Sequence, residues 1–315
     1  MRSLTTAEAA DWLLARNSFT ILTHCRPDGD TLGSAAALCR GLRSIGKSAF
    51  VLHNPEVTDK YAHLLEGISK PAAQPGDVIV SVDVAAPGML PEAFMHLLER
   101  IDLRIDHHRG LESFSAFELV DPQAAACGQM VYDVMRAMGV HLDTPMANAL
   151  YTAISTDTGC FRYQNTQSHT FEVAAACAAV SKDLPELNQI LFETNSLKRL
   201  KLQGWIIEHL KFLQDGKIAI CALPLSLEKE MGLTEDDMEN ISGFPRSIEG
   251  VKMAATLRQQ ESGVIKLSVR ALPGYDASAV CAQFGGGGHR GAAGATLDMS
   301  MDRAVEAVIA AMPEL

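Results

Sequence analysis

The stretch ILTHCRPDGDTLGSAAAL, residues 21–38, places His24, Asp28 and Asp30 within seven positions, directly after an apolar run. Imidazole nitrogens and carboxylate oxygens are ligands for divalent cations. A solvated surface loop could carry the same three side chains by chance. This stretch alone therefore leaves a metal site and an ordinary turn both open.

Three further clusters of acidic residues or histidines occur later in the chain. Asp83 follows the apolar run VIVSV, and Asp106, His107 and His108 follow LRI. Asp157 lies in STDTGCFRY, just after a predicted helix and before a glycine. Counting the first stretch, three of the four clusters thus come at the end of a predicted strand.

Taken singly, each cluster has a purely structural explanation. An aspartate before a helix is usually an N-cap, which would account for Asp30 or for Asp157. Asp83 could cap a turn, and His107 and His108 could form a pair at a sheet edge. The metal hypothesis therefore depends on whether the fold brings the clusters together.

The N-terminal part of the chain alternates short apolar runs with longer helical patterns. We predict strands at 19–24, 48–53, 77–83 and 102–108, and helices at 30–46, 90–101, 126–139 and 145–157. This alternation is typical of an α/β domain, in which helices cover both faces of a parallel sheet. The carboxyl ends of such strands share one edge, and ligands bind there.

The strand-end clusters should therefore meet at that edge. Several carboxylates packed together would repel one another, and divalent cations would neutralise them. Mixed carboxylate and imidazole ligands suit Mn²⁺, Mg²⁺ or Co²⁺, and of these we expect Mn²⁺. The absence of clustered cysteines argues against structural zinc.

Composition narrows the class of protein. The chain has 315 residues, of which 47% are hydrophobic and 21% charged, as in globular proteins with a sizeable core. Its net charge of −11 argues against binding of long or duplex nucleic acid, because phosphate neutralisation needs a basic face. Seven scattered cysteines predict reduced thiols and a cytoplasmic location. Neither a signal peptide nor an apolar run of membrane-spanning length is recognisable, so we expect no membrane partner.

The second half of the chain predicts a charged helical connector at 186–212 and a smaller α+β domain at 213–315. In that domain we predict strands at 217–224, 251–260 and 264–272, followed by a helix at 276–284 and a glycine run. The change from helix–strand alternation to strand-rich sequence marks the domain boundary.

The glycine run comprises Gly285, Gly286, Gly287 and Gly288 and could be a flexible linker. It is followed at once by HRGAAG and a predicted strand, inside a domain, which favours an ordered role. Glycine amides can approach a phosphate closely, and His289 and Arg270 could add side-chain donors. We therefore expect phosphate or nucleotide recognition here.

A match to the P-loop pattern occurs in GLRSIGKS, residues 41–48. That motif needs a strand before the loop and a helix after it, so that a helix N-terminus faces the phosphates. Here the helix precedes the loop and the strand follows. We interpret Gly46 as a helix C-terminal glycine, which disfavours a nucleotide triphosphatase.

In chain order, THCRPDGDTLGSAAAL, SVD, IDHH and STDTGCFRY resemble the motifs of the DHH phosphoesterase superfamily. SVRALPGYDASAVCAQFGGGGHRGAAGATL resembles its C-terminal DHHA1 domain. Together, at this length, they are similar to the bifunctional oligoribonuclease and PAP phosphatase family, the nano-RNases (PAP is 3′-phosphoadenosine 5′-phosphate). The resemblance implies a DHH catalytic domain at 1–185 and a DHHA1 substrate-binding domain at 213–315.

The resemblance also implies two divalent cations and a role for each site residue. The first cation would be bound by His24 and Asp28, the second by Asp30, His107 and Asp157, and both by a bridging Asp83. Asp106 would orient a ligand histidine from behind, and His108 would face the substrate phosphate.

The activity that the resemblance implies is hydrolysis of short oligoribonucleotides to 5′-mononucleotides and of PAP to AMP. Within the same chemistry, the alternatives are a phosphodiesterase for cyclic or linear dinucleotides and a hydrolase of polyphosphate or pyrophosphate. From another class, a non-catalytic nucleotide-binding module remains an alternative. The sequence leaves open the ranking of these substrates and the choice between a monomer and a homodimer.

Overall fold

The structure is a computed structural model that describes residues 2–108 and 113–315. The chain forms two compact units, Met1–Thr194 and Asn195–Leu315. The boundary falls inside the segment 186–212.

The first unit is built on a parallel sheet with the strand order β1-β7-β6-β5-β2-β3-β4. Its strands are β1 (Arg2–Ser3), β2 (Ser18–Leu22), β3 (Ser48–Leu52), β4 (Ser69–Lys70), β5 (Val78–Val82), β6 (Ile101–Asp106) and β7 (Phe117–Val120). The parallel α/β fold predicted for this unit is confirmed. The sequence did not indicate the short strands β1, β4 and β7, which lie at or near the sheet edges.

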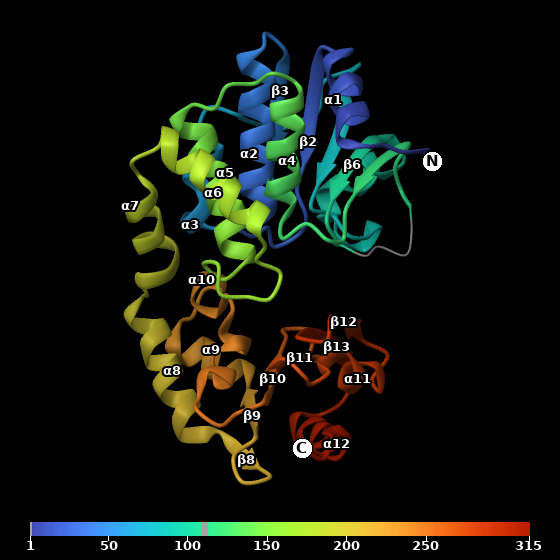
Figure 1. The fold of residues 1–315 in the computed structure, drawn as a ribbon. Coiled ribbons are helices and arrows are strands. Elements are labelled where there is room, and N and C mark those ends of the chain that lie inside the picture. The colour runs from blue at the N-terminus through green and yellow to red at the C-terminus, as the bar shows by residue number, and fades with distance from the viewer. Residues whose placement is uncertain (1, 109–112) are drawn as a thin grey trace. The chain divides into compact units, whose positions relative to one another are not determined.

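The α-helices and the 3₁₀ segment η1 cover one face of this sheet, and the 3₁₀ segments η2 and η3 cover the other. The helices are α1 (Thr6–Leu14), α2 (Gly29–Ser44), α3 (Asp59–Ala62), α4 (Cys127–Ala137), α5 (Thr144–Asp157), α6 (Ser168–Val180) and α7 (Leu184–Asn188), followed by the π-helix η4 (Gln189–Glu193). The 3₁₀ segments are η1 (His63–Leu65), η2 (Pro87–Met89) and η3 (Glu92–Arg100). Helices α1, α2, α4, α5 and α6 share the larger apolar core with the sheet (Figure 1).

The helix predicted at 90–101 is present as the 3₁₀ helix η3, Glu92–Arg100. Phe94 and Leu97 are buried against the sheet and lie three residues apart. A spacing of three matches the 3₁₀ repeat, in which residues i and i+3 lie one above the other. Burial of these two side chains therefore suits the tighter helix.

The chain order reverses between β2 and β5. From β2 the chain continues outward to β3 and β4, and it then returns to β5 on the opposite side of β2. In open parallel sheets this reversal opens a crevice at the carboxyl ends of the two strands. The fold therefore offers one preferred ligand site in this unit.

Helices α2 and α5 approach each other too closely for side chains larger than glycine at two positions of α2. A Cβ atom on Gly33 would lie 2.3 Å from the Ala149 carbonyl oxygen, and one on Gly29 would lie 2.5 Å from Thr156 Oγ1. The two glycines thus set the distance between the start of α2 and the end of α5. Those are the helix ends that carry Asp30 and Asp157.

The segment 41–48 is a helix end, as predicted. Gly46 has a φ of +83° and follows the last turn of α2. Its amide donates to the Arg43 carbonyl (3.0 Å), and the Lys47 amide donates to the Leu42 carbonyl (3.1 Å), which is the Schellman pattern. The Lys47 ammonium donates to the Leu14 carbonyl at 2.6 Å, at the end of α1. Helix precedes strand here, so a P-loop is excluded.

The second unit is built on a mixed sheet with the order β12-β13-β11-β10-β9-β8. Its strands are β8 (Lys211–Leu213), β9 (Ile218–Leu223), β10 (Met253–Gln259), β11 (Ile265–Ala271), β12 (Gly287–Gly288) and β13 (Ala292–Leu297). Its helical elements are α8 (Leu197–His209), α9 (Leu225–Met231), α10 (Glu235–Met238), η5 (Ile241–Gly243), η6 (Pro245–Ser247), α11 (Ala277–Ala282) and α12 (Met301–Ala311). The α+β class predicted for this part is confirmed.

Separate apolar cores form in the second unit. One core joins α11 and α12 to the sheet, and another joins α8, α9 and α10 to β9. Across both units, none of the helices within residues 2–108 and 113–315 has the length and apolarity needed to cross a membrane.

We expect Gly46→Ala to lower the free energy of unfolding by about 1 kcal/mol, because alanine is strained at a positive φ. Thermal unfolding would measure the loss. As a control, Lys47→Ala removes the P-loop lysine, and ATP should not raise the melting temperature of either variant or of the parent. A clear ATP-induced rise in the parent that Lys47→Ala abolishes would contradict the helix-end interpretation.

Candidate metal centre

The predicted ligands lie at the carboxyl ends of three neighbouring strands. His24 follows β2, Asp83 follows β5, and Asp106 ends β6, with His107 and His108 directly after it. These ends flank the point where the strand order reverses. The position is therefore the one at which a parallel sheet binds its ligand.

The N-terminus of α2 contributes two aspartates with different roles. Asp28 is the N-cap, and its carboxylate accepts hydrogen bonds from the amides of Asp30 (3.0 Å) and Thr31 (3.2 Å). Asp30 lies inside the first turn, and Asp157 is the last residue of α5. The N-cap alternative is therefore wrong for Asp30 and for Asp157, and it applies to Asp28 instead.

A first group of possible ligands comprises His24, Asp28 and Asp83. His24 Nε2 lies 3.6 Å from Asp28 Oδ1 and 3.6 Å from Asp83 Oδ2. On the other side of the ring, His24 Nδ1 donates to the Cys25 carbonyl at 2.8 Å. This hydrogen bond leaves Nε2 as the nitrogen that can bind a cation.

A second group comprises Asp30, His107 and Asp157. His107 Nε2 lies 3.7 Å from Asp30 Oδ2, 3.7 Å from Asp157 Oδ2 and 3.5 Å from Asp83 Oδ1. His107 Nδ1 donates to the Ala124 carbonyl at 3.2 Å, so Nε2 again faces the carboxylates. Asp83 thus reaches both groups, with one oxygen toward each.

Two buried polar atoms at the centre have no hydrogen-bond partner among the described residues: Asp83 Oδ1 and His107 Nε2. Buried polar atoms are nearly always paired, so an unmade bond at this position calls for a ligand. Two ligand atoms that bind one cation at about 2.1 Å lie roughly 3 Å or more apart. The nitrogen–oxygen separations of 3.5–3.7 Å within each group are consistent with that spacing. The residues present therefore fit divalent cations.

Neighbouring backbone and side-chain groups hold the outer two carboxylates in place. Asp30 accepts hydrogen bonds from the amides of Cys127 (2.7 Å) and Gly128 (2.9 Å) at the start of α4, and from Ser34 Oγ (3.1 Å). The Asn165 side-chain amide donates to the Asp157 carboxylate at 3.3 Å. Amides at a helix N-terminus attract a carboxylate, so these hydrogen bonds fix the position of the Asp30 side chain.

Crowding of the carboxylates changes their acidity. Burial, together with the charges of Asp83 and Asp157, holds the pKa of Asp30 well above its usual range. Burial, opposed by His107 and reinforced by Asp83, raises the pKa of Asp157 to about 7. For His24, burial disfavours the charge, but Asp28 and Asp83 outweigh it and raise the pKa. Protons thus occupy the centre unless cations replace them.

Asp106 holds His108, not the metal-ligand candidate His107. Asp106 Oδ1 accepts hydrogen bonds from the amide (3.0 Å) and from Nδ1 (2.9 Å) of His108. His108 Nδ1 also lies 3.4 Å from Asp83 Oδ1. Burial opposes the positive charge, but Asp106 and Asp83 raise the pKa of His108 to about 11. The histidine that was expected to face the phosphate is therefore the one that Asp106 orients.

Sequence reasoning missed Arg104, which forms an ion pair with Asp106. The available signal was the spacing Arg-x-Asp in a predicted strand, because residues i and i+2 lie on the same face. A charged residue between Leu103 and Ile105 in a central strand needs a buried partner. Asp102 and Asp106 were equally near on that face, and the structure pairs Arg104 with Asp106.

Asp83 adopts a left-handed backbone conformation, with a φ of +59°. Few residues other than glycine adopt it, and aspartate and asparagine tolerate it best. Its amide donates to the Ile105 carbonyl at 2.9 Å, which ties the turn after β5 to β6. The backbone here is held by its neighbours in a conformation that directs the carboxylate into the cluster.

In the second unit, the glycine run belongs to a strand pair, not to a flexible linker. A Cβ atom on Gly286 would lie 2.2 Å from the Gly294 carbonyl oxygen, and one on Gly288 would lie 2.7 Å from that of Ala292. Packing of β12 on β13 thus requires glycine at two of the four positions. A Cβ on Gly285 or Gly287 would meet nothing within 4 Å.

Arg270 and His289 lie in the same part of the second sheet. Arg270 of β11 is paired in register with Ala292 of β13, and His289 forms the turn before that strand, with its amide donating to the Ala292 carbonyl at 2.8 Å. The structure thus brings Arg270, His289 and the glycine run together. Their role in phosphate recognition stays a prediction.

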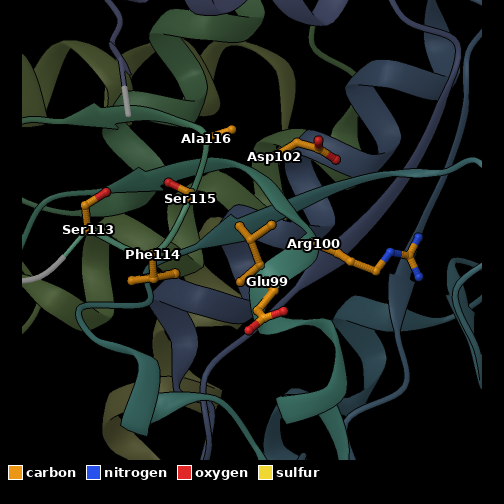
Figure 2. A pocket seen from close by; sticks show the side chains of 8 residues that line it. Glu99, Arg100, Asp102, Ser113, Phe114, Ser115 and Ala116 are labelled. Carbon is orange, nitrogen blue, oxygen red and sulfur yellow. The ribbon is translucent and has the colours of Figure 1, made fainter.

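A pocket elsewhere in the first unit is unrelated to this centre. Figure 2 shows it between the end of η3 and the segment before β7, with Arg100, Asp102 and Phe114 in its lining. It lies at the amino ends of β6 and β7, whereas the ligand cluster lies at the carboxyl ends. No predicted site residue lines it.

Comparison with known proteins agrees with this geometry. Residues 18–154 match the N-terminal domain of the DHH family, and residues 215–314 match the DHHA1 domain. The chain is 34% identical over 302 residues to the bifunctional oligoribonuclease and PAP phosphatase NrnA of Thermus thermophilus, covering 93% of this chain and 89% of that relative. The chain belongs to the DHH family. The match to the first domain includes every predicted ligand except Asp157.

Two further proteins are similar to most of the chain. The bifunctional oligoribonuclease and PAP phosphatase NrnA of Bacillus subtilis is 26% identical, with 87% of each chain covered. Among solved structures, an exopolyphosphatase-related protein from Bacteroides fragilis superposes with a TM-score of 0.81 at 23% identity, covering 97% of this chain and 94% of that one. This last similarity confirms the fold.

Raised pKa values in the cluster predict how metal binding depends on pH. Because the pKa of Asp157 rises from the usual 3.8 to about 7 in the folded state, its contribution to stability falls as pH rises across that interval. Asp30 and His24, whose pKa values are also raised, act in the same direction. Bound cations should displace these protons and remove the penalty.

We therefore expect Mn²⁺ to raise the melting temperature little at pH 5.5 and progressively more toward pH 8. Differential scanning fluorimetry on chelator-treated protein would measure this. Calorimetry in buffers of different ionisation enthalpy should show proton release on binding. A melting-temperature rise that is independent of pH, or binding without proton release, would contradict the assignment.

Proposed function

We propose that this chain is a metal-dependent phosphoesterase that hydrolyses short oligoribonucleotides to 5′-mononucleotides and PAP to AMP. The observation that carries the proposal is the pair of ligand groups that share Asp83. The family membership supports it, as do full-length relatives whose names give both activities. A non-catalytic module would have no need for two ligand groups that share one carboxylate.

Two divalent cations would supply an activated water and neutralise charge on the phosphate. The chain's own residues provide the remaining functions. Asp83 would fix the separation of the cations, because each of its oxygens faces a different ligand group. His108 would donate a hydrogen bond from Nε2 to the substrate phosphate, since its Nδ1 is committed to Asp106. Carboxylates and imidazoles together suit Mn²⁺, with Mg²⁺ or Co²⁺ as alternatives.

The second unit would recognise the part of the substrate away from the reacting phosphate. Arg270 would contact a phosphate through its guanidinium, and the His289 side chain would add a donor. The Gly285 amide already donates to the Ala282 carbonyl at 3.1 Å. The close packing of Gly286 and Gly288 on β13 would hold that loop in shape. These roles would be the same in a monomer and in a homodimer.

Asp83→Asn should abolish hydrolysis while the protein remains folded, because asparagine tolerates the positive φ at this position. Loss of a ligand shared by both groups should cost several kcal/mol of transition-state stabilisation. Steady-state kinetics with a labelled dinucleotide would measure it. Near-normal turnover would make Asp83 a turn cap and sink the two-metal proposal.

Asp77→Asn provides a matched control for this variant. Asp77 precedes the same strand, β5, and its buried carboxylate accepts hydrogen bonds from Thr20 Oγ1 (2.7 Å) and the Gln74 amide (2.8 Å). It lies at the amino end of the strand, away from the ligand cluster. This variant should lose stability and keep its turnover number, whereas Asp83→Asn should show the reverse.

Substrate length and salt dependence test the proposed recognition. We expect dinucleotides to be cleaved faster than strands of about twenty nucleotides, because a net charge of −11 leaves no basic track for long strands. Single strands lose binding with a slope of about −0.7 per neutralised phosphate, so a slope of roughly −1 to −2 is expected. A steep slope, or faster cleavage of long strands, would indicate a processive exonuclease.

Arg270→Ala or His289→Ala should raise KM and leave Mn²⁺ binding unchanged, because both residues belong to the second unit. Lys266→Ala is the control: Lys266 lies on β11, four residues before Arg270, and donates to Thr296 Oγ1 at 3.0 Å. The control should keep the parent KM. The same assays with cyclic dinucleotides, polyphosphate and pyrophosphate would show whether one of these is the better substrate.

A further inference from the structure

Arg104 is a fully buried arginine in the middle of β6. Strand β6 lies next to β5, which separates it from β2. Its side chain is 2% exposed, and the carboxylate of its partner Asp106 is inaccessible to solvent. A charged side chain is rarely buried so completely unless ion pairs and hydrogen bonds offset the free energy of its desolvation. Its contacts therefore indicate what it does.

A β-bulge at Asp102 turns Arg104 and Asp106 to the face of the sheet that lies away from the helical core. The register between β5 and β6 runs from Ile79–Ile101 to Val80–Leu103, so Asp102 is the additional residue. Leu103 and Ile105 then face the helical core. Arg104 and Asp106, two residues apart, share the opposite face. The bulge thus sets the direction of the buried charges.

The Arg104 guanidinium joins the end of β6 to the segment after β5, and both carry members of the ligand cluster. Its Nε donates to Asp106 Oδ2 at 3.0 Å, and its Nη2 donates to the same oxygen. Nη2 also donates to the Ala85 carbonyl at 3.1 Å, two residues after Asp83. On its outer side, Nη1 lies 3.8 Å from Glu118 Oε1, and the ring of Phe114 lies 5.0 Å from Cζ.

Asp106 is in turn divided between two partners. One oxygen, Oδ2, accepts from Arg104, and the other, Oδ1, accepts from the amide and from Nδ1 of His108. With Oδ2 fixed, the carboxylate cannot rotate without breaking its bond to the guanidinium. Oδ1 therefore has one position in which to receive the imidazole.

We propose that Arg104 is a positioning residue that acts through Asp106 to hold the His108 ring in the orientation used on the substrate. The inference rests on the proposed phosphoesterase function, in which His108 contacts the phosphate. Arg104 itself touches neither substrate nor cation. Substitution of a residue that orients a functional side chain through a hydrogen bond typically lowers activity by roughly 10- to 100-fold.

A purely structural role is the alternative, because loss of a buried ion-pair partner destabilises a fold whatever the function. The two roles differ in their dependence on His108. If Arg104 only stabilises β6, its effect on activity will be the same whether or not His108 is present. If it acts through His108, its effect will vanish once that imidazole is gone.

The experiment compares Arg104→Met, Arg104→Lys and His108→Gln, together with the double variants. We expect Arg104→Met to lower kcat by roughly 10- to 100-fold with KM and the Mn²⁺-induced rise in melting temperature nearly unchanged. Arg104→Lys keeps the charge but not the fork, and should lose less. In the His108→Gln background, either change should alter kcat by less than about two-fold.

Glu118→Gln is the matched control, since it neutralises the other acid beside the same guanidinium without touching Asp106. It should keep the parent kcat. If Arg104→Met does not fold, Arg104→Lys carries the same test. An equal loss of kcat with and without His108, or parent-like kcat in a folded Arg104→Met, would overturn the inference.

A spectroscopic measurement tests the geometry without activity. In the Mg²⁺-loaded or metal-free parent, the His108 Nδ1 proton bound to Asp106 should give a slowly exchanging downfield ¹H signal that His108→Gln removes. Arg104→Met should broaden or abolish this signal, and Glu118→Gln should retain it. An unchanged signal in Arg104→Met would overturn the inference. A parent that shows the signal but hydrolyses no substrate would instead overturn the proposed function.

Discussion

Three carboxylates, those of Asp30, Asp83 and Asp157, lie around one imidazole nitrogen, His107 Nε2, at 3.5–3.7 Å. Three carboxylates so close together cannot all remain ionised unless protons or cations compensate their negative charge. The raised pKa values of Asp30 and Asp157 show that protons compensate the charge when no cation is bound. Much of the surrounding structure serves to stop these side chains from escaping into solvent.

Several independent contacts impose this crowding. The left-handed backbone of Asp83 turns its carboxylate inward, and the amides of α4 hold Asp30 from behind. Gly29 and Gly33 bring α2 against α5, whose last residue is Asp157. Repulsion among the acids is therefore opposed by packing and hydrogen bonding elsewhere, so the centre is pre-organised for cations before they bind.

Much of this arrangement follows from sequence pattern, because strand ends of a parallel sheet must share an edge. The strands before His24 and Asp83 and the strand that ends at Asp106 were predictable, and so was the convergence of their acids. The details that were not predictable depend on tertiary contacts. Capping by Asp28 in place of Asp30 is decided by two residues of helix register, which pattern alone leaves open. The short strands β1, β4 and β7 carry too few residues for a periodic signal.

The spacing of Arg104 and Asp106 indicated that they share a face, but a bulge at Asp102 decides which face that is. A dependence of phosphate binding on cations follows from the same distribution of charge. The chain has a net charge of −11, and its ligand cluster adds local negative charge at the place where a phosphate must react. Without cations this edge would repel its own substrate. Cation binding should therefore strengthen phosphate binding, and under the proposed function the two should show positive thermodynamic coupling.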